Sequence, residues 1–187
     1  MIKGYKAFNS DKTNRYGFPF ESGNTYSVDG EIKFGNEGNG YHLCTSISDV
    51  FRYVDADSVD NYVIAEVYGF GDYKQFDDDY EGYYDMYSVR HLYIKKFLTR
   101  DEVFEIIKKL HEWQIMKIIK TSKLLPNEIA EYIKDKYKSN VSIICALLYY
   151  QLDQKDIYER YYGSRDIGFI KNELSLRKVK KDGQNNC

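Results

Sequence analysis

The chain is poor in the residues that usually build metal sites, disulfide frameworks and linkers. Its 187 residues include only three cysteines, three histidines and two prolines. Cys44, Cys145 and Cys187 lie too far apart for a zinc site or a disulfide framework, so we expect reduced thiols and no bound metal. No apolar run reaches the roughly 18 residues of a membrane-spanning helix, and the N-terminus lacks the apolar stretch of a signal peptide. These absences argue against a membrane protein and favour a protein of the cytoplasm.

Neither sign of charge dominates the chain as a whole, whose formal net charge is -2. This balance excludes a general electrostatic attraction to nucleic acid. The charge is nevertheless uneven, because residues 1–98 carry 10 basic and 16 acidic side chains, whereas residues 99–187 carry 17 and 13. A local basic surface in the second half is therefore compatible with nucleic-acid binding.

The first half of the sequence has the pattern of a β-rich domain. Alternation of apolar and polar residues predicts strands at 2–8, 25–28, 41–44, 62–68 and 89–97. Asp29-Gly30 is a tight-turn signal and predicts a hairpin in which residues 31–34 pair with the strand before the turn. Gly69 and Gly71 are expected to end the fourth of these strands.

From Thr99 onward the spacing of apolar residues becomes helical. Thr99 and Glu102 have the spacing of a capping box, and Asn140 can cap a further helix that is apolar nearly all round. In the first half, Ser46 can cap one short helix over residues 47–53. We therefore predict an α+β fold in three parts, namely a β-rich domain at 1–98, a helical subdomain at 99–163 and an extended tail at 164–187.

His42, Cys44 and Glu66 are the candidate catalytic residues. Alternation along the third strand puts His42 and Cys44 on one face, where the imidazole could act as the base for a thiol nucleophile. The alternative is that His42 is an ordinary strand residue bonded to backbone. Glu66 lies in a very apolar strand, so an ionised carboxylate there needs a partner or a functional role, unless it simply faces solvent.

Several short segments resemble a family of small domains of unknown function that occur in phage and mobile-element proteins. The segments are Gly4 to Asn9, Glu21 to Tyr26, Gly30 to Ile32, Gly40 to Cys44, Asp49 to Tyr53 and Ala65 to Val67. The resemblance covers about residues 3–98 and supplies no catalytic residues. The lack of a complete catalytic set and of a cofactor motif favours an uncharacterised, non-catalytic binding or interaction protein of this phage or mobile-element type in a bacterial cytoplasm, whose partner could be a protein.

The middle of this region is also distantly similar to ADP-ribosyltransferase-type folds, which implies an alternative function as an enzyme that uses NAD. Under this alternative the candidate ligand-binding residues are Lys6, Tyr41, Thr45, Ser46 and Arg90. Lys6 stands where those enzymes have Arg or His, and residues 89–97 contain no counterpart of their late Glu. The sequence thus leaves three functions open: a binding protein without a cofactor, an NAD-using enzyme, and a nucleic-acid-binding protein.

Overall fold

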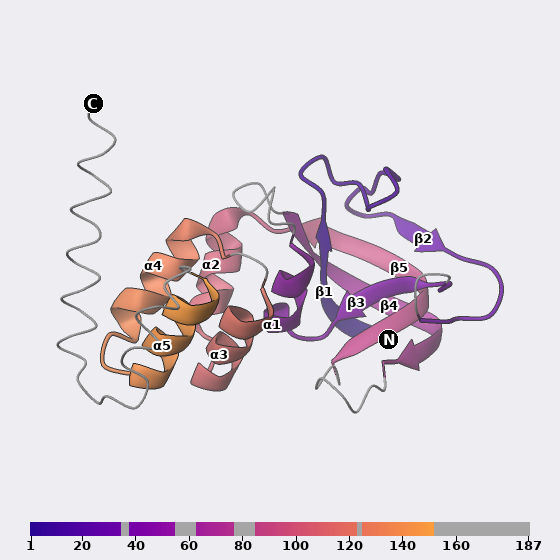
Figure 1. The fold of residues 1–187 in the computed structure, drawn as a ribbon. Coiled ribbons are helices and arrows are strands. Elements are labelled where there is room, and N and C mark those ends of the chain that lie inside the picture. The colour runs from indigo at the N-terminus through magenta and orange to yellow at the C-terminus, as the bar shows by residue number, and fades with distance from the viewer. Residues whose placement is uncertain (35–37, 55–62, 77–84, 123–124, 152–187) are drawn as a thin grey trace. The chain divides into compact units, whose positions relative to one another are not determined.

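The computed structural model describes residues 1–34, 38–54, 63–76, 85–122 and 125–151. Strands come first along the chain and helices follow them, so the predicted α+β fold is confirmed (Figure 1). The contacts within the chain separate two compact units, Met1–Ile129 and Ala130–Cys187, which are described one at a time. The boundary at residue 98 stays a prediction, and the predicted tail at 164–187 lies outside the described residues.

The first unit is built on five antiparallel strands. They are β1 (Ile2–Phe8), β2 (Thr25–Ser27), β3 (Tyr41–Cys44), β4 (Val63–Gln75) and β5 (Met86–Phe97). β4 pairs with both β1 and β5, β5 pairs also with β3, and β3 pairs with β1. These four strands therefore close into a ring, and the short strand β2 is added along β5.

Alternate side chains of the strands fill the inside of this ring. The core cluster consists of Phe8, Phe20, Leu43, Ala65, Val67, Val89, Leu92 and Ile94. Gly4 and Gly69 face the same core, where space is short. A Cβ atom on Gly4 would lie 2.4 Å from the Cys44 carbonyl oxygen, and one on Gly69 would lie 2.6 Å from Leu43 Cδ2. Glycine at these positions lets the strands approach closely enough for the ring to close.

Two predictions about the strands were wrong. Residues 31–34 form no strand, because β2 pairs with β5 instead, with Ser27 opposite His91. Gly71 does not end β4, which continues to Gln75 through an irregularity in its pairing with β5. Gly71 has a φ of +79°, which suits glycine and lets the extended backbone kink without ending the strand.

Three helices complete the first unit: α1 (Ile47–Val50), which a 3-10 turn over Phe51–Tyr53 extends, α2 (Arg100–Lys108) and α3 (Glu112–Thr121). The predicted N-caps are confirmed. Ser46 Oγ accepts a hydrogen bond from the Ser48 amide, and Thr99 and Glu102 form the reciprocal capping box. α1 contacts both β1 and β3, and α3 contacts α1.

The second unit contains the part of α4 (Asn127–Lys136) from Ala130 onward and all of α5 (Val141–Tyr150). Asn140 Oδ1 accepts a hydrogen bond from the Ile143 amide at 3.2 Å, so the predicted cap of α5 is confirmed. Five apolar residues of α5 are buried among those described: Ile143, Ile144, Ala146, Leu147 and Leu148. No helix within the described ranges is long and apolar enough to cross a membrane.

Replacing Gly4 by Ala tests the tight interior of the ring. The added Cβ meets a backbone carbonyl rather than a movable side chain, so we expect Gly4→Ala to lower the free energy of unfolding by about 2–3 kcal/mol. Gly23→Ala is the control, because Gly23 has a φ of +85° but nothing within 4 Å of its Cβ position. Gly23→Ala should lower the free energy of unfolding by about 1 kcal/mol, because it introduces backbone strain alone. If urea denaturation showed the same loss of stability for Gly4→Ala and Gly23→Ala, it would contradict the crowding of the ring interior at Gly4.

Candidate functional site

The three predicted catalytic residues do not meet in one place. Cys44 and Glu66 are both aligned with Tyr5, on the two sides of β1. Because neighbouring strands are about 4.8 Å apart, the Cα atoms of Cys44 and Glu66 are separated by roughly 10 Å, with Tyr5 between them. Glu66 instead binds two lysines, at 2.9 Å from Lys95 Nζ and 3.2 Å from Lys3 Nζ. The partner that a carboxylate in this apolar strand requires is therefore this pair of lysines.

The environment of Glu66 keeps its carboxylate ionised. Burial by itself would raise the pKa of Glu66, but the hydrogen bonds and charges of Lys95 and Lys3 outweigh burial and the pKa is lowered. A carboxylate of this kind accepts hydrogen bonds and makes a poor proton donor near neutral pH. Glu66 thus has a complete structural explanation as the centre of an ion-pair triad.

Cys44 lies in a setting that suppresses thiol reactivity. The residue is buried, and burial together with the charge of Asp49 raises the pKa of its thiol to about 12. A thiol with this pKa is protonated at neutral pH, whereas the thiolate is the nucleophile. The ring of His42 stacks on Phe34 at 5.1 Å, and no hydrogen bond joins it to Cys44 in the described part of the chain. The thiol–imidazole pair expected from strand alternation is therefore not formed.

The hydroxyl groups of Tyr41, Thr45 and Ser46 are used in local structure. Thr45 Oγ1 donates to the Asp85 carbonyl at 3.4 Å, and the Tyr41 hydroxyl donates to the Ser27 carbonyl at 3.5 Å. Ser46 caps α1 and accepts a hydrogen bond from Gln114 Nε2 of α3 at 3.4 Å. These bonds link loops and helices to the strands, so they account for the three residues without a ligand.

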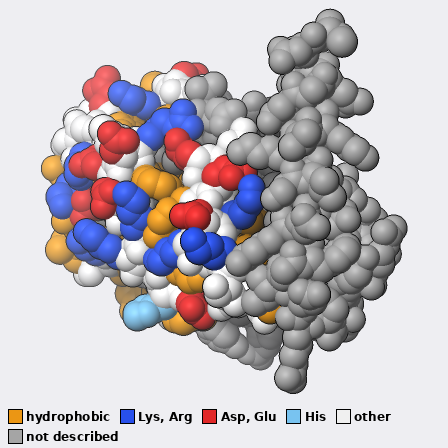
Figure 2. Space-filling view, turned by 90° about the vertical axis from the view of Figure 1, so that its left-hand side faces the viewer, with side chains coloured by type: hydrophobic (Ala, Val, Ile, Leu, Met, Phe, Trp, Pro, Cys, Tyr) orange, Lys and Arg blue, Asp and Glu red, His pale blue; other side chains and the backbone are white. Residues whose placement is uncertain are grey.

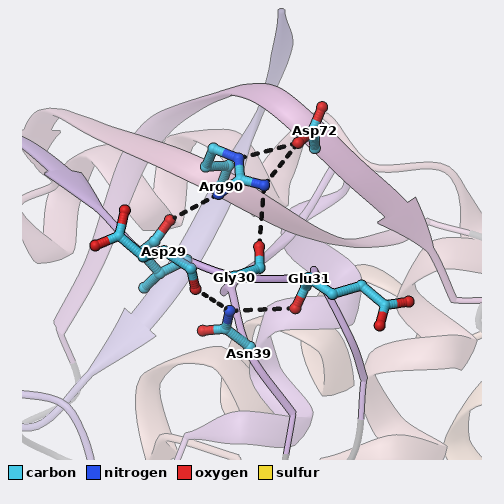
Figure 3. A network of polar contacts seen from close by, with 7 residues as sticks. Asp29, Gly30, Glu31, Asn39, Asp72 and Arg90 are labelled. Carbon is cyan, nitrogen blue, oxygen red and sulfur yellow. Dashed lines mark hydrogen bonds and ion pairs between the residues drawn. The ribbon is translucent and has the colours of Figure 1, made fainter.

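Arg90 holds the segment after β2 against β5, as Figure 3 shows. Its guanidinium donates to the carbonyls of Val28 and Gly30 at 3.2 and 3.0 Å, and it forms an ion pair with Asp72 at 2.7 Å. Asn39 holds the same segment from the other side through the carbonyl of Glu31 at 3.1 Å. Arg90 therefore fixes the turn after β2 to β5, the strand with which β2 pairs in place of residues 31–34.

A shallow hollow of about 490 Å³ lies beside this network. It is lined by Gly30, Glu31, Ile32, Asp72, Tyr73, Lys74 and Arg90. Its charges are already matched, since Glu31 pairs with Lys33 at 3.0 Å and with Lys74 at 3.5 Å, and Asp72 pairs with Arg90. The hollow thus presents few charges that a ligand could satisfy.

A second group of polar residues lies beside the short pairing between β1 and β3. Tyr5 and Cys44 are the one residue pair in register between these strands. Beyond this pair, the Lys6 side chain rather than the backbone of β1 bonds to β3, because Lys6 Nζ donates to the His42 carbonyl at 3.0 Å. The Lys6 side chain is partly buried, with its ammonium 5.7 Å from the Phe8 ring centre. The pKa of Lys6 is lowered to about 8, chiefly by burial, while Cys44 acts in the opposite direction and Arg15 adds to the lowering.

His42 belongs to the same group, which we call the basic cluster: Lys6, Arg15 and His42. Desolvation lowers the pKa of His42 to about 4, and the charges of Lys6 and Arg15 act in the same direction. No ion pair joins any member to a carboxylate within the described ranges. Sequence reasoning had selected Lys6 and His42 for other roles, and it had missed Arg15, which lies in a polar stretch with no motif.

Arg15 is carried by a loop over residues 9–20 that its own side chains hold in place. Asn9 Nδ2 donates to Thr13 Oγ1 and to the Asn14 carbonyl, each at 2.9 Å, and Asp11 Oδ1 accepts from the Thr13 amide at 3.0 Å. Asn14 Oδ1 accepts from the amides of Tyr16 and Phe18. Short polar side chains that bond nearby amides are typical of structured turns, so the spacing of Asn9, Asp11 and Asn14 is the signal that predicts an ordered loop.

Large side chains project from this ordered loop. Phe20 anchors it in the core, 5.0 Å from Phe8 between ring centres, and Phe18 packs edge-on against Phe20 at 5.3 Å. Tyr16 is nevertheless 73% exposed and Phe18 is 49% exposed. The Arg15 guanidinium lies 4.7 Å from the Tyr16 ring centre. The loop therefore presents an arginine and two aromatic rings to solvent in a fixed arrangement.

The buried carboxylate of Asp49 joins α1 to α3. Lys117 Nζ lies 2.5 Å from Asp49 Oδ1, while Asp49 Oδ2 has no hydrogen-bond partner among the residues described. Burial raises the pKa of Asp49, and Lys117 offsets this only in part. Ile115, Ile118 and Ile119 of α3 are fully buried as well, so α3 is an integral part of the first unit.

Comparison with known proteins places the chain in a family without a known function. The family described as Domain of unknown function (DUF7666) matches residues 2–106, more than half of the chain, and the chain belongs to this family. The predicted resemblance to a domain of unknown function is thereby confirmed. No curated protein and no solved structure matches the chain. The match ends within α2, so Lys117 lies beyond the family region although its partner Asp49 lies inside it.

The described residues offer no site for a metal, because they contain no group of three or more His, Cys, Asp or Glu side chains able to hold an ion. On the face shown in Figure 2, basic side chains lie among acidic ones rather than forming one basic patch. That face therefore gives no support to the predicted alternative of nucleic-acid binding, which stays a prediction.

Replacing Lys117 by Met tests the contact between Asp49 and α3. Loss of the cation leaves a buried carboxylate uncompensated, so we expect the free energy of unfolding at pH 7 to fall by about 3 kcal/mol. Burial raises the pKa of Asp49, so the native state takes up a proton at Asp49 more readily than the unfolded chain does. Loss of the lysine raises the pKa of Asp49 further, and a protonated Asp49 needs no counter-charge, so the loss of stability should shrink as the pH is lowered from 7 to 4.

Lys134→Met is the control for this experiment, because Lys134 pairs with Glu131 in an exposed contact of α4. Its stability should hardly change at either pH, as is usual for surface ion pairs. Urea denaturation at the two pH values measures both variants. If Lys117→Met lowered the free energy of unfolding by the same amount at pH 4 and pH 7, this would contradict the role assigned to the Asp49–Lys117 ion pair.

Proposed function

We propose that the chain is a non-catalytic binding protein whose contact surface is the loop over residues 9–20. The observation that carries this proposal is the fixed exposure of Arg15, Tyr16 and Phe18 on that loop. Tyrosine and arginine are among the residues that contribute most to protein–protein binding energy. A protein partner is therefore the class that this surface fits best.

The order of the loop supports the proposal. A loop that is already held by hydrogen bonds from Asn9, Asp11 and Asn14 loses little conformational freedom when it binds. Phe20 fixes the loop to the core of the ring, so the exposed side chains are presented from a rigid base. Binding residues on loops that a rigid scaffold positions are a common arrangement in proteins.

The resemblance to phage and mobile-element domains supports an origin in such an element and a place of action in a bacterial cytoplasm. The alternative of an ADP-ribosyltransferase-like enzyme would require Lys6, Tyr41, Thr45 and Ser46 to receive NAD. The hydroxyl bonds of Tyr41, Thr45 and Ser46 and the ion pairs of Glu66 supply local roles for the residues on which that alternative depends.

The double variant Tyr16→Ser/Phe18→Ser tests the proposed surface. Partners are captured from a lysate of the source cells with the wild-type chain, purified, and titrated against each variant. We expect the double variant to fold, because Tyr16 is largely exposed and Phe18 is half exposed, and to bind the purified partner at least about tenfold more weakly.

Tyr73→Ser is the matched control, since Tyr73 is 60% exposed and lies on β4, outside the loop. It should bind the partner as the wild type does. Equal binding by the wild type and the double variant, or capture of nothing beyond what the double variant captures, would contradict the proposal. Release of nicotinamide from NAD by the purified chain would replace it with the enzymatic alternative.

A further inference from the structure

The strand β4 extends past its neighbour β1 and leaves part of one edge without a strand beside it. β5 pairs with β4 as far as Gln75, whereas β1 pairs with the other side of β4 only as far as Gly69. Among the described residues no strand continues beyond β1 on that side, so Phe70 to Lys74 form an open edge. An open edge offers backbone donors and acceptors to an added strand.

The backbone of Tyr73 points toward this open edge. The Phe76 amide donates to the Met86 carbonyl of β5 at 2.9 Å, so Phe76 and Met86 form a hydrogen-bonded pair. Such pairs alternate along an antiparallel strand with pairs that exchange no hydrogen bonds. The backbone of Lys74 therefore faces β5, and the N–H and C=O of Tyr73 face the side that β1 leaves open.

The side chains before and after Tyr73 carry opposite charges. Asp72 and Lys74 lie on one face of β4, and they are 74% and 52% exposed. Their ion pairs with Arg90 and Glu31 are exposed contacts of the kind that contribute little to stability, so a second partner can share them. The hollow that borders Asp72 and Lys74 leaves room beside these charges for a further side chain.

We propose that the open edge of β4 pairs with the same edge of a second copy of the chain, antiparallel and centred on Tyr73. This two-fold arrangement sets Tyr73 of one copy opposite Tyr73 of the other, with two N–H to C=O hydrogen bonds between them. It also sets Asp72 of each copy opposite Lys74 of the other. These are the closely spaced pairs of the ladder, in which opposite charges attract most effectively.

The charges also select the occupant and the register. Lysine on an edge strand usually discourages pairing with a copy, but here each Lys74 meets an aspartate instead of a like charge. A register centred on Lys74 would set two lysines opposite each other, so the register centred on Tyr73 is favoured. An edge of five residues buries little area, and we expect a dissociation constant of about 10–100 µM.

Sedimentation velocity of the full chain from about 1 µM to about 1 mM measures the dimer. Amide hydrogen exchange over the same range locates it, because the Tyr73 N–H should exchange more slowly as the dimer forms. Amides of the loop over residues 9–20 should exchange at rates that do not depend on concentration. A chain that stays monomeric throughout, or a dimer in which exchange at Tyr73 is unchanged, would overturn the proposal.

Charge reversal tests the register. Asp72→Lys sets like charges against Lys74 of the other copy, and Lys74→Asp sets like charges against Asp72, so each variant alone should dimerise at least about tenfold more weakly. An equimolar mixture of the two variants should associate about as tightly as the wild type, because every charged pair is then opposite in sign. A loss of local structure in either variant would not be rescued by mixing.

Lys120→Asp is the matched control, since it makes the same charge change at an exposed position of α3, and it should dimerise as the wild type does. A mixture no tighter than its components, or an equal weakening by Lys120→Asp and Lys74→Asp, would contradict pairing through β4. The Tyr16→Ser/Phe18→Ser variant should still dimerise, so the β4 edge and the proposed partner surface are tested separately.

Discussion

The hydrogen bonding of β4 to both β1 and β5 is the constraint on which the first unit depends. Residues Ala65 to Gly69 pair on both sides, which turns an open antiparallel sheet into a ring of four strands. A ring this small leaves little interior volume, so Gly4 and Gly69 stand where any side chain would collide with a neighbouring strand. Closure also removes most of the exposed strand edges that invite aggregation.

The same closure leaves β1 and β3 paired over a short stretch. β1 is held along its whole length by β4, so it meets β3 in register only at Tyr5 and Cys44. Lys6 then satisfies the His42 carbonyl with its ammonium group, and the charge of Arg15 on the loop over residues 9–20 helps to lower the pKa values of both residues. The basic cluster is thus a consequence of how the ring closes, and it places three cationic or potentially cationic groups together without a described counter-charge.

The sequence predicted those features that depend on neighbouring residues. The caps at Ser46, Thr99 and Asn140 are local hydrogen bonds, and the strands at residues 2–8 and 41–44 follow from local alternation. The hairpin predicted after Asp29 is absent because β2 pairs with β5, which lies far away in the chain, and Arg90 of β5 binds the carbonyls of Val28 and Gly30.

Contacts between distant residues also account for what the sequence could not show of the candidate site. Nothing near Asp49 indicates that its partner is Lys117, and nothing near Lys6 indicates Arg15. His42 and Glu66 were both predicted from local context, yet their environments differ. The charges of Lys6 and Arg15 disfavour the protonated form of His42, whereas Glu66 forms ion pairs with Lys3 and Lys95.

The pKa of His42 in the free protein tests the central claim most directly, namely that desolvation and two neighbouring cations surround this histidine without a counter-charge. An NMR titration of its imidazole resonances measures this value in the folded chain. The account predicts that His42 titrates far below its ordinary value of 6.5, at about 4. A pKa at or above 6.5 would mean that the ring is solvated or faces an acidic partner, and it would contradict the existence of an uncompensated basic cluster.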